Sequence, residues 1–462
     1  MPTLTTDAAA IAARLDRLPA SRHVWRLVVL LSLGGCFEFY DLFMTAYVTP
    51  GLIRSGVFSG TAKGLFGLSD QATFAAATFA GLFLGTIIFS QLTDRLGRRT
   101  IFTFSLLWYT AATIVMAFQD TAIGIDVWRL ISGIGIGVEL VTIDTYITEL
   151  MPKHLRGRAF AINQFIQFLA VPIVAFLCYL LVPIDPMGMP GWRWVMLIGA
   201  VGAVFVWFIR AAVPESPRWL ALHGRLTEAD RVTAEIEWRI IDELGPLEPP
   251  SQVPVEEEGQ GRFSEILRSP YLGRTIMLSV FNFFQTIGFY GFGNWVPSLL
   301  AAQGASVTKS LQYSFIIAIA YPIGPLICST FADRFERKWQ IVAAAIGTAC
   351  FGLLFSQQSE PMALITFGVL ITLSNNLLSY AYHAYQAELF PTRIRARAVG
   401  FVYSWSRLST VATSFMIAFF LQDFGTIGVF AFIAASMGMV VIAIGIFGPK
   451  TRNLALEEIS GA

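Results

Sequence analysis

One polar motif occurs twice in this chain and divides it into two similar halves. The motif ELMPKHLRGRA at residues 149–159 returns as ELFPTRIRARA at residues 388–398, an offset of 239 positions. At the same offset, TDR at residues 93–95 coincides with ADR at residues 332–334. Two separate motifs that share one offset indicate a duplicated unit, and a duplication fixes topology more firmly than any local propensity.

The duplicated halves are mostly apolar. Of the 462 residues, 55% are hydrophobic and 14% are charged, whereas soluble domains usually carry about 25% charged residues. The sequence therefore predicts a membrane protein, and a parallel repeat in such a chain is typical of transporters whose halves enclose the substrate site. The net charge is +1 and the basic residues are spread over short loops, which excludes nucleic acid as a partner.

Signatures of chemical catalysis are missing from the sequence. The four cysteines lie inside apolar runs, without the spacing of a zinc site or a disulfide framework. There is no GxxxxGK[ST] loop and no constellation of nucleophile or metal ligands. We therefore expect no metal, no cofactor and no enzymatic activity, and we expect transport to use a gradient or to run downhill.

The apolar runs have the length of membrane-crossing helices, which need about 20 mostly apolar residues. By that measure the sequence predicts twelve crossings, six in each half. They are residues 25–48, 71–92, 101–118, 123–148, 159–181 and 192–212, followed by 272–299, 311–331, 339–356, 362–387, 398–421 and 424–447.

Lysine and arginine gather in the loops that hold the repeated motifs, which predicts that these loops and both termini are cytoplasmic. LTEADRVTAEIEWRIIDEL, from Leu226, has Thr227 as its expected N-cap and predicts an amphipathic helix under the membrane. Residues 246–261, rich in Pro and Glu, predict a flexible linker. The predicted organisation is a cytoplasmic segment (1–24), a first bundle (25–212), a cytoplasmic loop (213–271), a second bundle (272–447) and a cytoplasmic tail (448–462).

Each repeated motif places an acidic residue near arginines at the end of a span. Positive-inside anchoring would explain any one such loop, but four loops in register favour an ion-pair network. We expect this network to hold the halves together when the cytoplasmic gate is shut and to open with it. The predicted gate residues are Asp94, Arg95, Arg98, Glu149, Arg156, Asp333, Arg334, Arg337, Glu388 and Arg395.

The ordered set DRLGRRT, TELMPKHLRG, PESPRWL (residues 214–220), AELFPTRIRA and LALEEI resembles the major facilitator superfamily, most closely its sugar-porter-like and metabolite–proton symporter branches. The resemblance runs over nearly the whole chain. It implies an all-α membrane protein with twelve transmembrane helices in two six-helix bundles, related by pseudo-two-fold symmetry, that rock about a central cavity.

Ionisable residues inside spans cost several kcal/mol unless they face partners or water, so they are functional candidates. Asp41 lies about 24 Å from the inner face and Arg129 about 30 Å, so the two side chains could meet. FYD at residues 39–41 and RLISGIGIG at residues 129–137 look like the symporter positions where an aspartate pairs with an arginine and takes up the coupling proton. A static ion pair is the alternative. Glu38 shares the helix face of Asp41, either as a second proton site or as support for the first.

Glu139 and Arg407 fall about 15–18 Å deep, near the midplane, one in each half. GVELVTIDTYITELMP, from Gly137, resembles branches that handle organic acids. Arginine is the natural bidentate holder of a carboxylate, so we expect Arg407 to receive an anionic substrate and Glu139 to neutralise it in the empty state. A permanent brace between the two is the alternative.

Further candidates for the substrate site come from the resemblance and from polar or aromatic residues in spans. INQF matches the sugar-porter pattern at Gln164, whereas span 7 keeps Gln285 without the paired glutamines and His383 stands at the porter tryptophan position; these departures count against a hexose. The remaining candidates are Tyr290, Asn294 and Tyr382.

The sequence therefore predicts a secondary active transporter in the inner or plasma membrane, acting as a monomer. We expect proton-coupled symport of a small organic acid, with an aromatic carboxylate as one option. Symport of a sugar or polyol, a nutrient sensor that binds without turnover, and an uncoupled facilitator or exporter remain alternatives.

Overall fold

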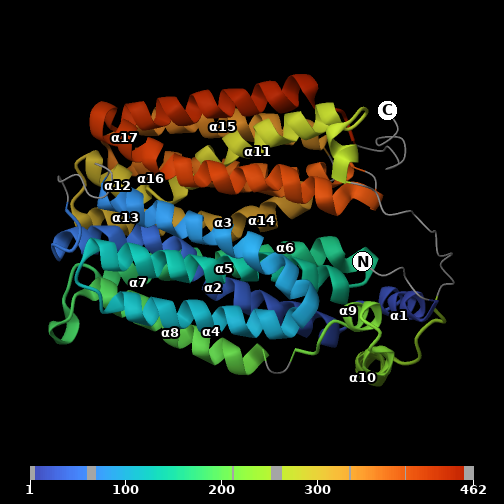
Figure 1. Cartoon of the computed structure of the whole chain (residues 1–462). Helices are drawn as coiled ribbons and strands as arrows, with labels where there is room; N and C mark the ends of the chain where they lie inside the picture. Colours follow the sequence, from blue (N-terminus) through green and yellow to red (C-terminus); the bar gives the residue numbers. More distant parts are fainter. Residues whose placement is uncertain are drawn as a thin grey trace.

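The structure, a computed structural model, describes residues 6–59, 69–210, 213–250, 263–331, 335–390 and 392–451. These residues form helices and connecting turns, with no β-strand among them. The long helices lie side by side, with the first half of the chain stacked against the second (Figure 1). Eight helical stretches of the described chain are long and apolar enough to cross a membrane by themselves, so the full set of twelve crossings stays a prediction.

The first half contains helices at each of its predicted span positions. They are α2 (Arg22–Arg54), α3 (Asp70–Leu96), α4 (Arg98–Ala117), α5 (Ala122–Leu150), α6 (Arg156–Phe168), α7 (Ala170–Leu181) and α8 (Gly191–Arg210). Three begin at a side-chain cap, because the hydroxyls of Ser21, Ser69 and Thr121 each accept a bond from a backbone N–H three residues on. The predicted fifth span is broken into α6 and α7 at Leu169.

The second half follows the same plan with more breaks. Its helices are α11 (Leu272–Gly293), α12 (Val296–Ala302), α13 (Val307–Ala318), α14 (Ala320–Phe331), α15 (Arg337–Ser356), α16 (Pro361–Glu388) and α17 (Thr392–Phe447). The predicted seventh span is two helices separated at Asn294 and Trp295, and the eighth begins earlier than predicted and breaks at Ile319. α17 covers both last predicted spans and turns at Gly425, whose φ of 64° suits glycine.

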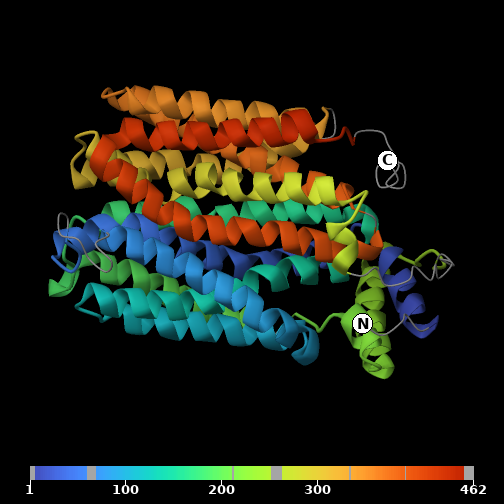
Figure 2. The same ribbon diagram turned by 45° about the horizontal axis from the view of Figure 1, so that its top comes forward.

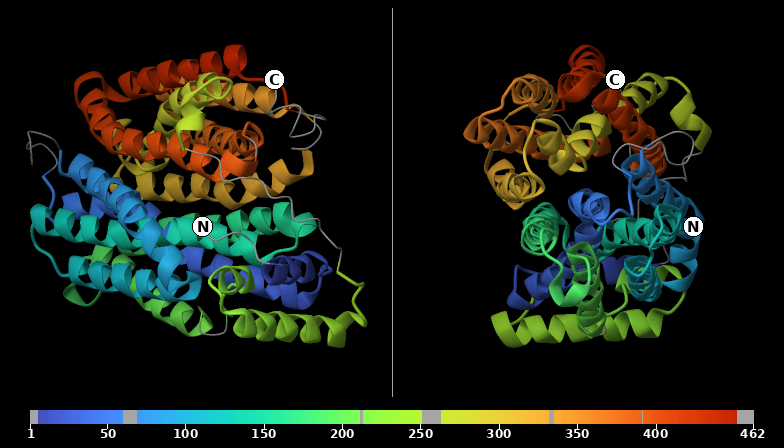
Figure 3. Two further views of the ribbon diagram at one scale, coloured as in Figure 1. Left: turned by 45° about the vertical axis from the view of Figure 1, so that its right-hand side comes forward. Right: turned by 90° about the vertical axis from the view of Figure 1, so that its left-hand side faces the viewer.

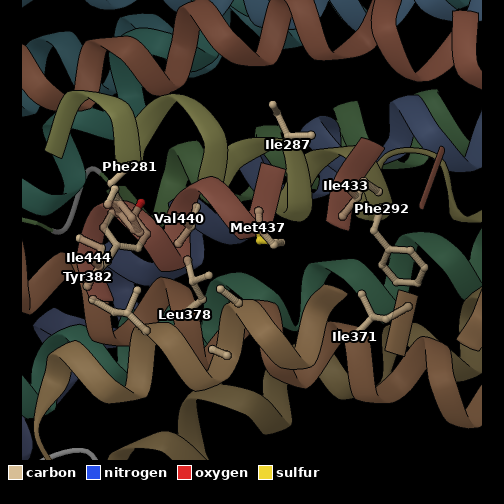
Figure 4. Packing of buried hydrophobic residues seen from close by; sticks show 14 of the residues in the cluster. Phe281, Ile287, Phe292, Ile371, Leu378, Tyr382, Ile433, Met437, Val440 and Ile444 are labelled. Atoms are coloured by element: carbon tan, nitrogen blue, oxygen red, sulfur yellow. The ribbon is translucent and has the colours of Figure 1, made fainter. Parts of the chain in front are cut away.

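Each half has its own packed core. In the second half, α11 packs on α17, and α15 packs on α16 and α17. Figure 4 shows side chains of this core, among them Phe281, Tyr382 and Met437. In the first half, α3 and α4 pack on α5, and α2 packs on α6 and α8. Contacts between the halves join α3 to α17, α6 to α14, α7 to α13 and α2 to α12. In Figure 2 most of the second half lies above the first, and helices of the two halves meet in the middle of the view.

The repeated motif folds the same way in both halves. Arg156 Nε donates to the main-chain oxygen of Met151 at 3.2 Å, and Arg395 Nε donates to that of Phe390 at 3.1 Å. Both donors and both acceptors are related by the offset found in the sequence. The duplication is therefore preserved in the hydrogen bonding of the two loops.

A small helical cluster covers one end of the first half: α1 (Thr6–Asp16), α9 (Pro217–Leu222) and α10 (Leu226–Leu244) (Figures 1 and 3). We call this end of the molecule the α10 end. The predicted amphipathic helix is confirmed as α10, but the predicted cap is wrong. Gly224 adopts a φ of 75° and the helix starts after Arg225, without a side-chain cap, so Thr227 already lies in the first turn.

Ion pairs attach α1 to the other two helices of this cluster. Arg14 and Arg17 each place Nη2 2.6 Å from a carboxylate oxygen of Glu237, and Arg218 Nη2 lies 2.7 Å from Asp16. Burial raises the pKa of the Glu237 carboxyl, but the two arginine bonds outweigh that effect and hold the pKa below its usual range. Most of the predicted linker, residues 251–261, lies outside the described residues, and the domain boundaries stay predictions.

Candidate functional site

Asp41 on α2 and Arg129 on α5 form an ion pair inside the first half. Arg129 Nη1 donates to Asp41 Oδ2 at 2.6 Å, and Nη2 donates to the main-chain oxygen of Asp41 at 2.8 Å. The Arg129 side chain is 0% exposed and the Asp41 side chain is 6% exposed. The depth estimate from the sequence therefore brought the correct two residues together, while their role in proton coupling stays a prediction.

Neighbouring hydroxyls complete the bonding of this pair. Thr113 Oγ1 donates to Asp41 Oδ1 at 3.1 Å, and Ser132 Oγ lies 3.3 Å from Oδ2. Arg129 Nε donates to Thr78 Oγ1 at 2.8 Å. A buried ion pair is tolerated only when its remaining hydrogen-bonding positions are satisfied, and here helices α2, α3, α4 and α5 all contribute.

A second buried arginine, Arg407 on α17, lies among tyrosines of the second half. Its guanidinium carbon lies 5.0 Å from the ring centroid of Tyr403, and Nη2 donates to the Tyr403 hydroxyl at 3.3 Å. Tyr290 on α11 and Tyr382 on α16 lie within electrostatic reach of the same guanidinium. Arg407 is 8% exposed, and a desolvated cation over an aromatic face is held by a favourable cation–π interaction.

Glu38 provides the carboxylate that acts on Arg407 from the other half. It is fully buried on α2 and lies within electrostatic reach of both Arg407 and Tyr290. The sequence had assigned this counter-charge to Glu139, which belongs to α5 but whose side chain is outside the described part. A depth estimate also fits Glu38, since it lies about 20 Å beyond Trp25 and Arg407 lies about 18 Å beyond Arg395.

His383 on α16 lies beside the same cluster. Its side chain is exposed and lies within electrostatic reach of Arg407. The ring stacks on Tyr382 at a centroid distance of 4.1 Å, and its centroid lies 6.0 Å from that of Tyr403. The structure thus gathers Glu38, Tyr290, Tyr382, His383, Tyr403 and Arg407, which we call the central site.

The other predicted substrate residues are distributed along the helices around the central site. Tyr290 also contacts the first half, because its ring centroid lies 4.8 Å from the ring centroid of Phe79 on α3. Gln285 is buried on α11, Asn294 is buried at the break after α11, and Gln164 is partly buried on α6. Sequence reasoning missed Tyr403, which lies one helical turn before Arg407 and could have been found by that spacing.

Two of the predicted gate arginines that the structure describes form ion pairs within one half. Arg337 forms an ion pair with Glu388, joining α15 to α16. The repeat places Arg98 and Glu149 at the equivalent positions, but the Arg98 side chain lies outside the described part. Arg156 Nη2 lies 3.8 Å from Asp16 of α1. The side chains of Asp94, Arg95, Asp333 and Arg334 are also not described, so an ionic link between the halves stays a prediction.

Several contacts between the halves lie away from the α10 end. The Tyr321 ring of α14 lies 5.2 Å from Phe43 and 5.6 Å from Phe168, both in the first half. Ser298 Oγ of α12 donates to Gln71 Oε1 of α3 at 2.9 Å. Helices α12 and α13 lie at the opposite end from α9 and α10 in Figure 1, so the bond between Ser298 and Gln71 joins the halves at that end.

An all-helical membrane bundle with two similar halves and charged side chains from both at its centre defines a secondary transporter of the major facilitator type. The sequence model described as Sugar (and other) transporter matches residues 27–462. The chain therefore belongs to this transporter family of the major facilitator superfamily.

Individual relatives agree with this family over almost the whole chain. YyaJ of Bacillus subtilis (strain 168), provisionally named a metabolite transport protein, is 32% identical and covers 96% of both chains. The niacin transporter NiaP of Acinetobacter baylyi is 27% identical over 97% of this chain and 99% of its own length. A solved D-xylose-proton symporter shares the fold with a TM-score of 0.73 at 19% identity, over 94% of this chain and 100% of that one.

Proposed function

We propose that this protein is a proton-coupled symporter of a small organic acid, working by alternating access between its two halves. The observation that carries the proposal is Arg407, a buried guanidinium in the second half that lies among tyrosines and within electrostatic reach of Glu38 of the first half. A planar guanidinium binds a carboxylate through two parallel hydrogen bonds. A substrate carboxylate that replaces Glu38 at Arg407 would keep the central site neutral.

Aromatic side chains around Arg407 favour an acid that carries a ring. Tyr290, Tyr382, Tyr403 and His383 all lie in the central site. Ring faces pack well against other rings in offset or edge-on geometry. The niacin transporter among the relatives carries a heteroaromatic substrate by its name, which supports an aromatic carboxylate for this chain.

Proton coupling rests on the two buried carboxylates of α2. Protonation of Asp41 would remove the charge that holds Arg129, and protonation of Glu38 would release Arg407 for the substrate. Each protonation step changes the free energy of one orientation of the halves relative to the other. Such a difference shifts the population between the two orientations. The relative with the shared fold is a proton symporter by name, which supports coupling to the same ion.

A sugar or polyol is the second candidate substrate. The family description names sugars, and Gln164 and Gln285 could hydrogen bond hydroxyl groups. Such a substrate would leave Arg407 without an anionic ligand. We further propose that both termini face the cytoplasm, that the protein lies in the inner or plasma membrane and that it acts as a monomer.

Ligand binding by the purified protein tests the proposal. A ligand that binds only the folded form raises its apparent stability, so a panel of small carboxylates and a panel of sugars are compared by thermal shift. Stabilisation by aromatic carboxylates, followed by their uptake into proteoliposomes under an inward proton gradient, supports the proposal. Stabilisation by sugars alone, or uptake that ignores the gradient, would overturn it.

A further inference from the structure

We propose that His383 makes the central site selective for carboxylates that carry a second hydrogen-bond donor, such as a ring hydroxyl or N–H group. The inference rests on the proposed role of Arg407 as the carboxylate holder. It adds a specificity-determining residue that, like Arg407, lies beside Tyr403.

The hydrogen bond of Nδ1 fixes the tautomer of His383. Nδ1 lies 2.7 Å from the main-chain oxygen of Ser379, one turn earlier on α16. A carbonyl oxygen has no proton to give, so Nδ1 carries the hydrogen and donates it. In a neutral imidazole the other nitrogen, Nε2, is then an acceptor. The backbone of α16 therefore determines which kind of polar group His383 offers to a ligand.

Two further contacts hold the orientation of the ring. His383 is stacked on Tyr382 with an interplanar angle of 30°, so rotation about its side chain would lose both the stack and the Ser379 bond. The side chain is nevertheless exposed. Because Nδ1 bonds Ser379, Nε2 is the ring nitrogen that can accept a bond from a ligand.

Arg407 and His383 both lie beside Tyr403. The guanidinium carbon of Arg407 lies 5.0 Å from the Tyr403 ring centroid, and the His383 centroid lies 6.0 Å from it. The charged and titratable groups near His383 are Arg407, Tyr382 and Tyr403. A ligand anchored at Arg407 thus meets the Nε2 acceptor of His383, and a donor on the ligand satisfies it.

Four related ligands separate this effect from carboxylate binding: benzoate, 3-hydroxybenzoate, 4-hydroxybenzoate and 4-methoxybenzoate. Their dissociation constants are measured by isothermal titration calorimetry on the full-length protein. At least one hydroxybenzoate should bind roughly three- to tenfold more tightly than benzoate, the range of one added hydrogen bond. 4-Methoxybenzoate, which keeps the oxygen but has no proton to donate, should show no such gain.

The variant His383→Phe keeps a flat ring for the Tyr382 stack and removes both nitrogens. It should lose the preference for the hydroxybenzoates over benzoate, whereas the exposed control His154→Phe should keep that preference. Equal binding of all four ligands by the parent would overturn the inference, and so would a preference that survives in His383→Phe. Failure of every carboxylate to bind would instead overturn the proposed function.

Discussion

Arg129 donates two hydrogen bonds to Asp41. Nη1 donates to the carboxylate at 2.6 Å, and Nη2 donates to the main-chain oxygen at 2.8 Å. Only the first contact depends on the charge of Asp41. Protonation would therefore weaken the connection between α2 and α5 without abolishing it. A carboxylate whose contacts change on protonation, while the fold stays intact, suits the role of a proton-coupling residue.

Asp41→Asn should abolish accumulation of the substrate but leave exchange of substrate across the membrane. The amide cannot cycle between charged and neutral forms, while the main-chain contact to Arg129 remains. Gradient-driven uptake and counterflow are compared in proteoliposomes. Asp120→Asn, in an exposed ion pair with Arg193, is the control and should behave like the parent. Unchanged accumulation by Asp41→Asn would remove this residue from coupling.

Arg407→Ala should lower affinity for carboxylates roughly 10- to 150-fold, because a hydrogen bond to a charged group contributes about 1.5–3 kcal/mol. Arg407→Lys should recover only part of the loss, since an ammonium lacks the planar fork of the guanidinium. Calorimetric titration with benzoate measures both. Arg239→Ala, which removes an exposed partner of Glu235, is the control. Tight benzoate binding by Arg407→Ala would show that the anchor is elsewhere.

Glu38→Gln should make anion binding stronger. In the parent, the Glu38 carboxylate lies within electrostatic reach of Arg407 and competes with the substrate carboxylate for its charge, whereas the glutamine is neutral. Calorimetric titration with benzoate compares the two proteins, and equal or weaker binding by Glu38→Gln would contradict the competition.

Glu237→Gln should loosen α1 from α10 while the membrane bundle stays intact. The lowered pKa of Glu237 means that its stabilisation is complete above the unfolded-state value of about 4.3 and disappears as pH falls through the lower folded-state value. Hydrogen exchange of residues 6–16 measures the loosening. Glu235→Gln on the exposed face of α10 is the control, and equal protection in both variants would argue against the docking role.

Gly425→Ala should lower the melting temperature, because a φ of 64° with a ψ of −164° costs an alanine about 1–3 kcal/mol. Gly438→Ala, in the same helix with open space around its Cβ position and an ordinary backbone, is the matched control and should be neutral or slightly stabilising. Equal melting temperatures for the two variants would show that the turn tolerates a side chain.

The sequence predicted the architecture because a repeat and long apolar runs are visible without coordinates. It predicted the contact between Asp41 and Arg129 because residue counts give depth. Depth does not give direction around a helix, which is why Glu38 was paired only with Asp41 and its proximity to Arg407 was missed.

A proline inside α14, after the break in the predicted eighth span, shows a different limit. Pro325 has no N–H for the main-chain oxygen of Tyr321, and Asn376 Nδ2 of α16 donates to that oxygen at 3.1 Å. The proline could have been noticed in the sequence, but the replacement donor lies 55 residues away. Local propensity therefore could not show which group bonds the oxygen that the proline leaves without its helical donor.

The ring contacts of Tyr321 with Phe43 and Phe168 join the two halves through uncharged groups. Contacts between uncharged rings are not screened by dissolved salt, so this part of the boundary between the halves should hold equally well at low and at high ionic strength.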